Sequence, residues 1–115
     1  MFLLAVTCHP LDPRGKKEKG KSRKGDGTYY DVGLGSCGIQ NSDTEMVVAL
    51  SKALMSEGAY CGKKVKLSTK KGTVVATVVD TCPGCDENSV DLSTAAFKKL
   101  GQLSTGRLKL DWSFL

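Results

Sequence analysis

The sequence has no apolar run approaching the 18 or so residues that a membrane-spanning helix needs, so we expect no membrane span and no membrane partner. Its 115 residues are too few for a two-domain enzyme or a large α/β barrel. They suffice for one soluble domain with one core. A domain this small leaves about a third or more of its unfolded surface in water, so disulfides would help to stabilise it.

Most of the chain has no net charge, although the whole chain has a formal net charge of +5. The first 25 residues carry seven Lys or Arg against two acidic residues, whereas residues 26–115 carry ten of each. Residues 13–25 contain no hydrophobic residue, so residues 9–25 are predicted to be a disordered basic segment. It is either simply solvated or attracted to anionic wall polymers, lipids or nucleic acid. Because it has no aromatic residue to stack on bases, we expect no nucleic-acid partner.

Residues 1–8 are apolar except for Thr7. They are too few for a complete secretory signal, and no basic residue precedes the apolar run. We interpret them as a short or truncated signal-like leader, with a misassigned gene start as the alternative. Residues 26–115 then form the folded domain.

Four cysteines, Cys37, Cys61, Cys82 and Cys85, remain once Cys8 is set aside with the leader. An even number in a small domain is typical of two disulfides formed in an oxidising environment, which favours a secreted, extracellular protein. Three pairings are possible. We favour Cys37 with Cys61 and Cys82 with Cys85.

The pair Cys82 and Cys85 has two alternatives, a redox motif and half of a zinc site. Structural zinc usually takes four Cys or His ligands, and the only histidine is His9 in the basic segment. A redox thiolate needs the start of a helix, whereas an acidic stretch, residues 86–89, follows Cys85. We therefore favour the structural disulfide and expect no metal and no cofactor.

Most of the organised chain is predicted to form strands. Thr28–Val32 is rich in β-prone residues between glycines, and residues 46–50 are a short apolar run. Residues 65–69 and 73–80 flank a Lys-Lys-Gly turn and predict a hairpin. Residues 51–57 have a helical composition and are followed by a glycine.

The end of the chain has the clearest patterns. Residues 93–101 are predicted to form a helix that Ser93 caps and Gly101 ends. Residues 107–115 alternate apolar and polar side chains, as in a strand with one buried face. About six short strands, two short helices and 13 glycines indicate a small closed barrel, because closure removes exposed strand edges.

Several short motifs occur in an order that resembles a known group of proteins. They are Gly27 to Asp31, Gly35 to Gly38, Val48 to Ser51, Cys61 to Lys63, Val78 to Cys85, Asp91 to Ser93, and Ala96 with Phe97. Together they look like the double-psi β-barrel domain of single-domain expansin-like proteins, closest to the fungal loosenin type. The resemblance runs from about Gly25 to the end of the chain.

The resemblance implies a mainly β fold, a six-stranded double-psi β-barrel with one or two short helices. It also implies secretion and a shallow polysaccharide-binding groove. The same barrel is shared by rare lipoprotein A proteins, family 45 endoglucanases, barwin-type defence proteins and an inhibitor of papain. The fold alone therefore does not determine the function.

Three carboxylates, Asp31, Asp80 and Asp91, are candidates for chemistry on a polysaccharide. Inverting hydrolysis needs one carboxyl group that donates a proton and a second that activates water, about 6.5 to 9.5 Å apart. The resemblance implies that Asp80 and Asp91 are two groove acids, that loosening depends on Asp91, and that Thr28 accompanies it. The alternatives are a turn acid for Asp80 and a helix-start cap for Asp91.

Asp31 lies near the position where family 45 endoglucanases carry their base, a carboxylate that expansins lack. Along a strand, however, Thr28 and Tyr30 face one way while Tyr29 and Asp31 face the other. If Thr28 lines the groove, Asp31 points away from it unless a bulge re-aims its side chain.

Sugar rings commonly stack on aromatic side chains, but the chain has only three Phe, three Tyr and one Trp. Because Tyr29 and Tyr30 face opposite ways, one of them is expected to line the groove. Trp112 lies on the apolar side of the last predicted strand, which favours core packing over the alternative of sugar contact.

These expectations combine into a secreted, monomeric, non-hydrolytic protein that binds and loosens cell-wall polysaccharide, with cellulose, chitin or peptidoglycan as the partner. Asp91, uncharged at mildly acidic pH, would hydrogen-bond a glycan hydroxyl, while Asp80, Thr28 and one tyrosine would orient the chain. The alternatives are a polysaccharide-cleaving enzyme of the endoglucanase or lytic transglycosylase type, and a barwin-like effector or papain-type protease inhibitor.

Overall fold

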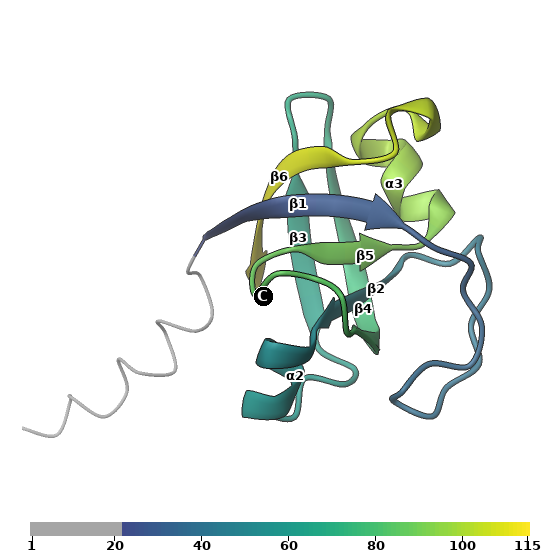
Figure 1. Ribbon diagram of the computed structural model, residues 1–115. Coiled ribbons are helices and arrows are strands. Elements are labelled where there is room, and N and C mark those ends of the chain that lie inside the picture. Colours follow the sequence, from purple (N-terminus) through teal and green to yellow (C-terminus); the bar gives the residue numbers. More distant parts are fainter. Residues whose placement is uncertain (1–21) are drawn as a thin grey trace, which may run out of the picture.

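The structure is a computed structural model that describes residues 22–115 (Figure 1). The predicted leader and residues 9–21 of the basic segment lie outside the described residues. The elements are, in chain order, β1 (Arg23–Tyr29), β2 (Val47–Ser51), α2 (Lys52–Glu57), β3 (Lys64–Ser68), β4 (Thr73–Cys82), β5 (Val90–Leu92), α3 (Thr94–Leu100), η2 (Leu103–Thr105) and β6 (Leu108–Phe114). Within the described part of the chain, no helix is long and apolar enough to cross a membrane.

The six strands close into a barrel in the order β1-β5-β2-β4-β3-β6. The pairs β1–β5 and β2–β4 are parallel, and the other four pairs are antiparallel. Every strand therefore has a partner on both sides, which leaves no free sheet edge. The predicted mainly β fold, a six-stranded barrel with two short helices, is confirmed. Figure 1 shows α3 beside the ends of β1 and β6, and α2 on another side of the barrel.

Alternate residues of the strands fill the barrel. In β6 the side chains of Leu110, Trp112 and Phe114 are buried, whereas the residues between them are not, as the alternation in the sequence predicted. Phe97 of α3 joins the same core and has no exposed surface. The core is thus built from strand residues of one face and from one side of α3.

Both helices begin at a serine that caps them. The Ser51 hydroxyl accepts a hydrogen bond from the Leu54 N–H of α2, and the Ser93 hydroxyl accepts one from the Ala96 N–H of α3, each at 3.2 Å. Such a cap satisfies a backbone donor of the first turn that has no partner within the helix. Each helix ends at the glycine that the sequence indicated.

The first strand differs from its prediction, because β1 spans Arg23–Tyr29 rather than Thr28–Val32. It pairs with β5 and β6, and it extends into the segment that the sequence predicted to be disordered. A Cβ at Gly27 would lie 2.6 Å from the Leu110 side chain, so this glycine allows close packing on the core. The three-residue strand β5 was not predicted as a separate strand either.

Both predicted disulfides are present. Cys37–Cys61 ties the long loop between β1 and β2 to the segment before β3, with Cα atoms 5.7 Å apart. Cys82–Cys85 closes the turn after β4, with Cα atoms 5.4 Å apart. Residues 22–115 contain no group of three or more His, Cys, Asp or Glu side chains that could hold a metal ion.

Candidate functional site

Four residues lie in one row across neighbouring strands, and we call them the acid row: Thr28, Asp91, Ala49 and Asp80. Thr28 of β1 is in register with Asp91 of β5, which is in register with Ala49 of β2. Ala49 is in turn in register with Asp80 of β4. Because neighbouring strands lie about 4.8 Å apart, the backbones of the two acids are separated by two strand spacings, or about 10 Å.

Strand alternation turns the first part of the acid row to the outer face of the barrel. Val90 and Leu92, on either side of Asp91, belong to the core, so the side chain between them points outward. Thr28 follows Gly27, whose added Cβ would meet leucine side chains of the core. Thr28 therefore also faces outward.

Asp80 reaches the same face because β4 contains a bulge. Val48 pairs with Val78, but the next residue, Ala49, pairs with Asp80, so Val79 is an extra residue on β4. Val78 belongs to the core. Without the extra residue, strict alternation would turn Asp80 inward as well. The bulge thus brings the second acid onto the outer face.

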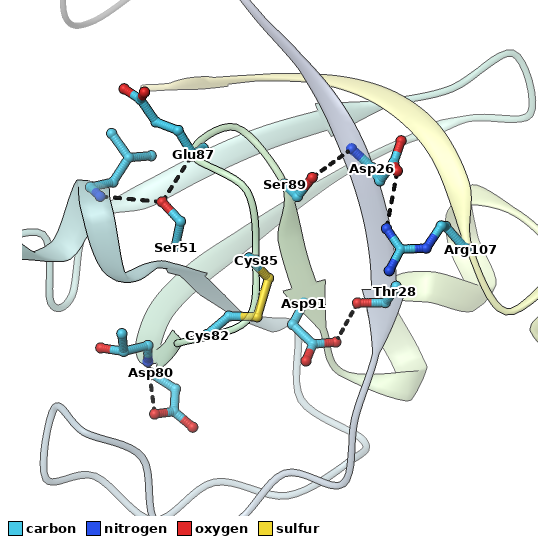
Figure 2. Close-up of a disulfide and its surroundings, with 12 residues drawn as sticks. Asp26, Thr28, Ser51, Asp80, Cys82, Cys85, Glu87, Ser89, Asp91 and Arg107 are labelled. Carbon is cyan, nitrogen blue, oxygen red and sulfur yellow. Dashed lines mark hydrogen bonds and ion pairs between the residues drawn. A yellow bond between two sulfur atoms is a disulfide. The ribbon is translucent and has the colours of Figure 1, made fainter.

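A hydrogen bond joins Thr28 to Asp91 (Figure 2). The threonine Oγ1 donates to the aspartate Oδ1 at 2.8 Å. Burial of Asp91 is the largest influence on its pKa and raises it above the usual 3.8, and the negative charge of Asp80 acts in the same direction. The Thr28 hydrogen bond and the charge of Arg107 lower the pKa but do not reverse the shift. Asp91 therefore keeps its proton to a higher pH than an exposed aspartate does.

Asp80 is held by backbone donors. Its Oδ1 accepts hydrogen bonds from the Ser36 N–H at 2.9 Å and from its neighbour's N–H, that of Thr81, at 2.8 Å. The hydroxyl groups of Ser36 and Thr81 form a further hydrogen bond at 2.7 Å. Since Ser36 belongs to the β1–β2 loop, these contacts fasten that loop to the acid row.

Tyr30 brings a buried hydroxyl group close to both acids. Its oxygen makes no hydrogen bond within the usual geometric limits to any described residue. Burial is the largest cause of a raised pKa of Tyr30, and the charges of Asp80 and Asp91, together with contact with the Asp80 carboxylate, add to it. Tyr30 is therefore the tyrosine that lies beside the acid row, and its buried hydroxyl group is close to the Asp80 carboxylate.

Tyr29 faces the other way, as the alternation predicted. Its ring packs on Phe97 with centroids 4.8 Å apart, and its hydroxyl donates to the Leu103 carbonyl oxygen at 2.9 Å. These contacts give Tyr29 a structural role that links the end of β1 to α3 and η2.

Two further predicted site residues are not part of the acid row. Trp112 is 2% exposed, and its indole N–H donates to the Asn88 carbonyl oxygen at 2.9 Å. Trp112 therefore packs in the core, as the sequence favoured, because a buried ring has no exposed face on which a sugar could stack. Asp31 is exposed and lies beyond the end of β1.

The Cys82–Cys85 disulfide lies on the same face as the acid row (Figure 2). Cys82 follows Asp80 by two residues on β4, so both side chains point outward. Ser51, in register with Cys82, donates its hydroxyl to the Glu87 carbonyl oxygen at 2.8 Å. The disulfide and this bond hold the turn that borders the acid row.

Gly35 allows the β1–β2 loop to pack on the bulge. A Cβ at Gly35 would overlap the Val79 carbonyl oxygen and lie 3.1 Å from the Asp80 side chain. We expect Gly35→Ala to displace the loop, to weaken the hydrogen bond from Ser36, and to lower the free energy of unfolding by about 1 to 3 kcal/mol. Gly84→Ala is the matched control, because a Cβ there meets nothing within 4 Å. Equal effects of the two substitutions in urea unfolding would contradict this close packing.

Comparison with known proteins agrees with this geometry. The chain matches the family model described as lytic transglycolase over residues 22–112. An Asp f 7 allergen homologue of Arthroderma benhamiae is 45% identical over 82 residues, which cover 66% of this chain and 28% of the relative. The allergen Asp f 7 of Aspergillus fumigatus is 38% identical over 107 residues, or 87% of this chain and 39% of the relative. The chain therefore spans less than half the length of these two relatives.

A papain inhibitor and an expansin are two similar proteins whose structures have been solved. The papain inhibitor of Streptomyces mobaraensis is 35% identical over 112 residues, which cover 90% of this chain and 75% of the inhibitor. The structure of a Streptomyces papain inhibitor has a TM-score of 0.77 at 34% identity and covers 84% of this chain and 96% of that one. A mutant expansin of Clavibacter michiganensis in complex with cellohexaose has a TM-score of 0.76 at 30% identity, over 82% of this chain and 50% of that one. The chain belongs to the double-psi β-barrel family that the lytic transglycolase model describes.

Proposed function

We propose that this chain is a secreted, non-hydrolytic, expansin-like protein that binds and loosens cell-wall polysaccharide, cellulose or chitin. The observation that carries the proposal is the outward-facing Asp91, which keeps its proton to a raised pH while it accepts a hydrogen bond from Thr28. The similar expansin, crystallised with cellohexaose, supports a β-linked glucan as the ligand class. The two disulfides support secretion, because such bonds form in oxidising environments.

Loosening would follow from competition for hydrogen bonds. The Asp91 carboxyl group donates to a glycan hydroxyl when it is protonated and accepts from one when it has lost its proton, and the Thr28 hydroxyl offers a second polar contact beside it. Each net hydrogen bond contributes only about 1 kcal/mol, so several must act together to displace glycan–glycan contacts. The acid row suits this task, since Thr28 and Asp91 lie on neighbouring strands and Asp80 lies two strands beyond Asp91 on the same face.

Hydrolysis with inversion would also need a carboxylate that is free to activate water. The Oδ1 of Asp80 already accepts two backbone hydrogen bonds, and Asp31 is exposed beyond the end of β1. These positions favour binding without cleavage. The name of the family model, lytic transglycolase, supports the alternative of bond cleavage, which product analysis distinguishes.

Asp91→Asn tests the proposal. A carboxyl group can donate or accept at the oxygen that faces the ligand, whereas the amide nitrogen of asparagine only donates. We expect loosening, measured as the loss of tensile strength of cellulose or chitin films, to fall at least about ten-fold, equivalent to about 1.4 kcal/mol. Loosening by the parent protein should also fall as the pH rises through the raised pKa of Asp91, because the donating form disappears.

The same variant separates a binding role from a structural one. Folded Asp91 holds its proton more tightly than the unfolded chain, so the parent loses stability as the pH rises from below 3.8 through the raised pKa. Asp91→Asn escapes this loss and should stay within about 1 kcal/mol of the parent in unfolding free energy. Asp86→Asn, on an exposed loop, is the charge-matched control and should loosen like the parent. Undiminished loosening by Asp91→Asn would overturn the proposal.

Inhibition of a papain-type protease is the second candidate, supported by the similarity that spans 96% of the papain inhibitor structure. The β1–β2 loop would carry it, because Cys37–Cys61 ties this loop down while Leu34 and Ile39 remain 71% and 46% exposed. Papain inhibition that Asp91→Asn leaves intact and Leu34→Ala abolishes would favour this function over loosening.

A further inference from the structure

Three adjoining hollows follow β3 and β6, away from the acid row. The largest, about 540 Å³, shares Thr69, Lys70 and Lys109 with a second of about 430 Å³. It shares Ser68 and Asp111 with a third of about 270 Å³. A fourth hollow of about 410 Å³, lined by Asp86 and Glu87 among others, adjoins the largest one at Lys24 and Lys109. We call the other three hollows the lysine groove. Because they adjoin, they form a path along the barrel rather than one compact pocket.

The lysine groove carries more positive than negative charge. The lysines that line it are Lys24, Lys66, Lys70, Lys71 and Lys109. Its two acids are already paired: Asp111 lies 3.1 Å from Lys24, and Asp26 lies 3.3 Å from Lys109 and 3.0 Å from Arg107. The remaining three lysines have no acidic partner within residues 22–115 and are available to an anionic ligand.

Two of these lysines stand on a turn that is held in place. Lys70 and Lys71 belong to the turn between β3 and β4, which rises beside β6 and α3 (Figure 1). The Thr69 hydroxyl donates to the Leu100 carbonyl oxygen of α3 at 2.7 Å and accepts from the Lys71 N–H at 3.1 Å. The backbone of the turn is therefore ordered before a ligand arrives, which lowers the entropy cost of binding.

The lining of the groove distinguishes between anionic polymers. Trp112 is the only aromatic residue that lines it, and this ring is buried, so nucleic-acid bases find no surface on which to stack. Arg107, whose guanidinium would suit phosphate, is engaged with Asp26. Ammonium groups with the Ser68 hydroxyl between them match a polymer that carries both carboxylates and sugar hydroxyls.

The basic segment joins the folded domain at the same place. Ser22, the first described residue, lines the third hollow. Residues 14–21, directly before it, contain five Lys or Arg and one Glu. Their net charge has the same sign as that of the groove, so their contribution to binding has to be measured separately.

We propose that the lysine groove binds an acidic polysaccharide, a polymer of uronic acids, independently of the acid row. The barrel then has two binding faces, one for a neutral glycan and one for an anionic glycan. Binding of the full chain to polygalacturonate, measured by calorimetry at low and high salt, tests this. We expect binding that weakens as salt screens the charges, and none to the methyl-esterified polymer.

Three double variants with the same loss of charge locate the binding. Replacing Lys70 and Lys71 with glutamine should weaken polygalacturonate binding about five- to ten-fold, since each exposed charge contact contributes modestly. The same change at Lys98 and Lys99, exposed on α3 and outside the groove, should weaken it less than about two-fold. The pair Lys16 and Lys17 controls for the basic segment. Lys70→Gln with Lys71→Gln should leave loosening of neutral cellulose unchanged, so this test stands apart from that of Asp91.

Several results would overturn the proposal. They are no binding of polygalacturonate, a loss at either control pair as large as that at Lys70 and Lys71, and equal binding of the methyl-esterified polymer. Tighter binding of a single-stranded DNA oligonucleotide with the same dependence on the two lysines would assign the groove to nucleic acid instead.

Discussion

Trp112→Ala is expected to lower the free energy of unfolding by about 3 to 5 kcal/mol, a large part of the stability of a small domain. The ring is 2% exposed and meets Phe114 edge-on, with centroids 5.3 Å apart. Its indole N–H donates a hydrogen bond to the Asn88 carbonyl oxygen, and the Arg23 guanidinium lies 5.5 Å from the ring centroid. Truncation removes all these contacts and leaves a cavity in the barrel.

Urea unfolding with the disulfides intact measures this loss. Leu34→Ala is the control, because Leu34 is a large apolar side chain that is 71% exposed, and its change should stay within about 0.5 kcal/mol. A loss below about 1 kcal/mol for Trp112→Ala would mean that the ring is not part of the core and would restore the alternative of a sugar contact.

Loss of the Cys37–Cys61 disulfide, through serine at both positions, is expected to cost about 3 to 4 kcal/mol. The two cysteines are 24 residues apart, so the bond restricts a long loop of the unfolded chain. The same bond holds the loop from which the Ser36 N–H reaches Asp80. We therefore expect the variant to lose polysaccharide loosening as well as stability.

Serine at Cys82 and Cys85 is the matched comparison. This disulfide spans a separation of only 3, so its loss should cost about 2 kcal/mol, less than the loss of the longer link. Thermal and urea unfolding of both variants, with the remaining disulfide verified by mass spectrometry, measure the difference. A larger loss for the short link than for the long one would contradict this account.

The fold was predicted best where a local pattern is long or strongly marked. β6 alternates over seven residues, α3 has a serine cap and a terminal glycine, and a Lys-Lys-Gly turn joins β3 to β4. β5 has three residues and depends on pairing with β1 and β2, which are distant in sequence. A strand this short does not show a recognisable alternation of apolar and polar residues. β1 begins among polar residues and glycines because pairing with β6 outweighs their low β propensity.

The site was predictable in its residue types but not in its arrangement. Thr28 and Asp91, expected to act together, are joined by a hydrogen bond. Asp80 reaches the same face only through a bulge in β4, and the valine-rich sequence of that strand has no pattern that marks an extra residue. The main partner of Asp80 from the loop is the backbone N–H of Ser36, which no side-chain type identifies. The sequence left Tyr29 and Tyr30 as equal candidates for the groove tyrosine, because it does not show which face of the strand is turned toward the acids.

The family relationship limits the possible activities of this chain but does not select one of them. A papain inhibitor and an expansin have nearly equal TM-scores to this chain, 0.77 and 0.76, so the barrel accommodates different activities. The acid row favours a glycan as the ligand because it combines a carboxyl group of raised pKa with a threonine hydroxyl on one outer face.

The most direct test of the central claim is a combined binding and product assay on cellulose, chitin and peptidoglycan. The purified, oxidised chain is incubated with each polymer, bound protein is measured by pull-down, and new reducing ends or anhydro-sugars are sought by mass spectrometry. We predict binding to cellulose or chitin without products. Products that appear with the parent and disappear with Asp91→Asn would contradict non-hydrolytic loosening and identify the chain as a polysaccharide-cleaving enzyme.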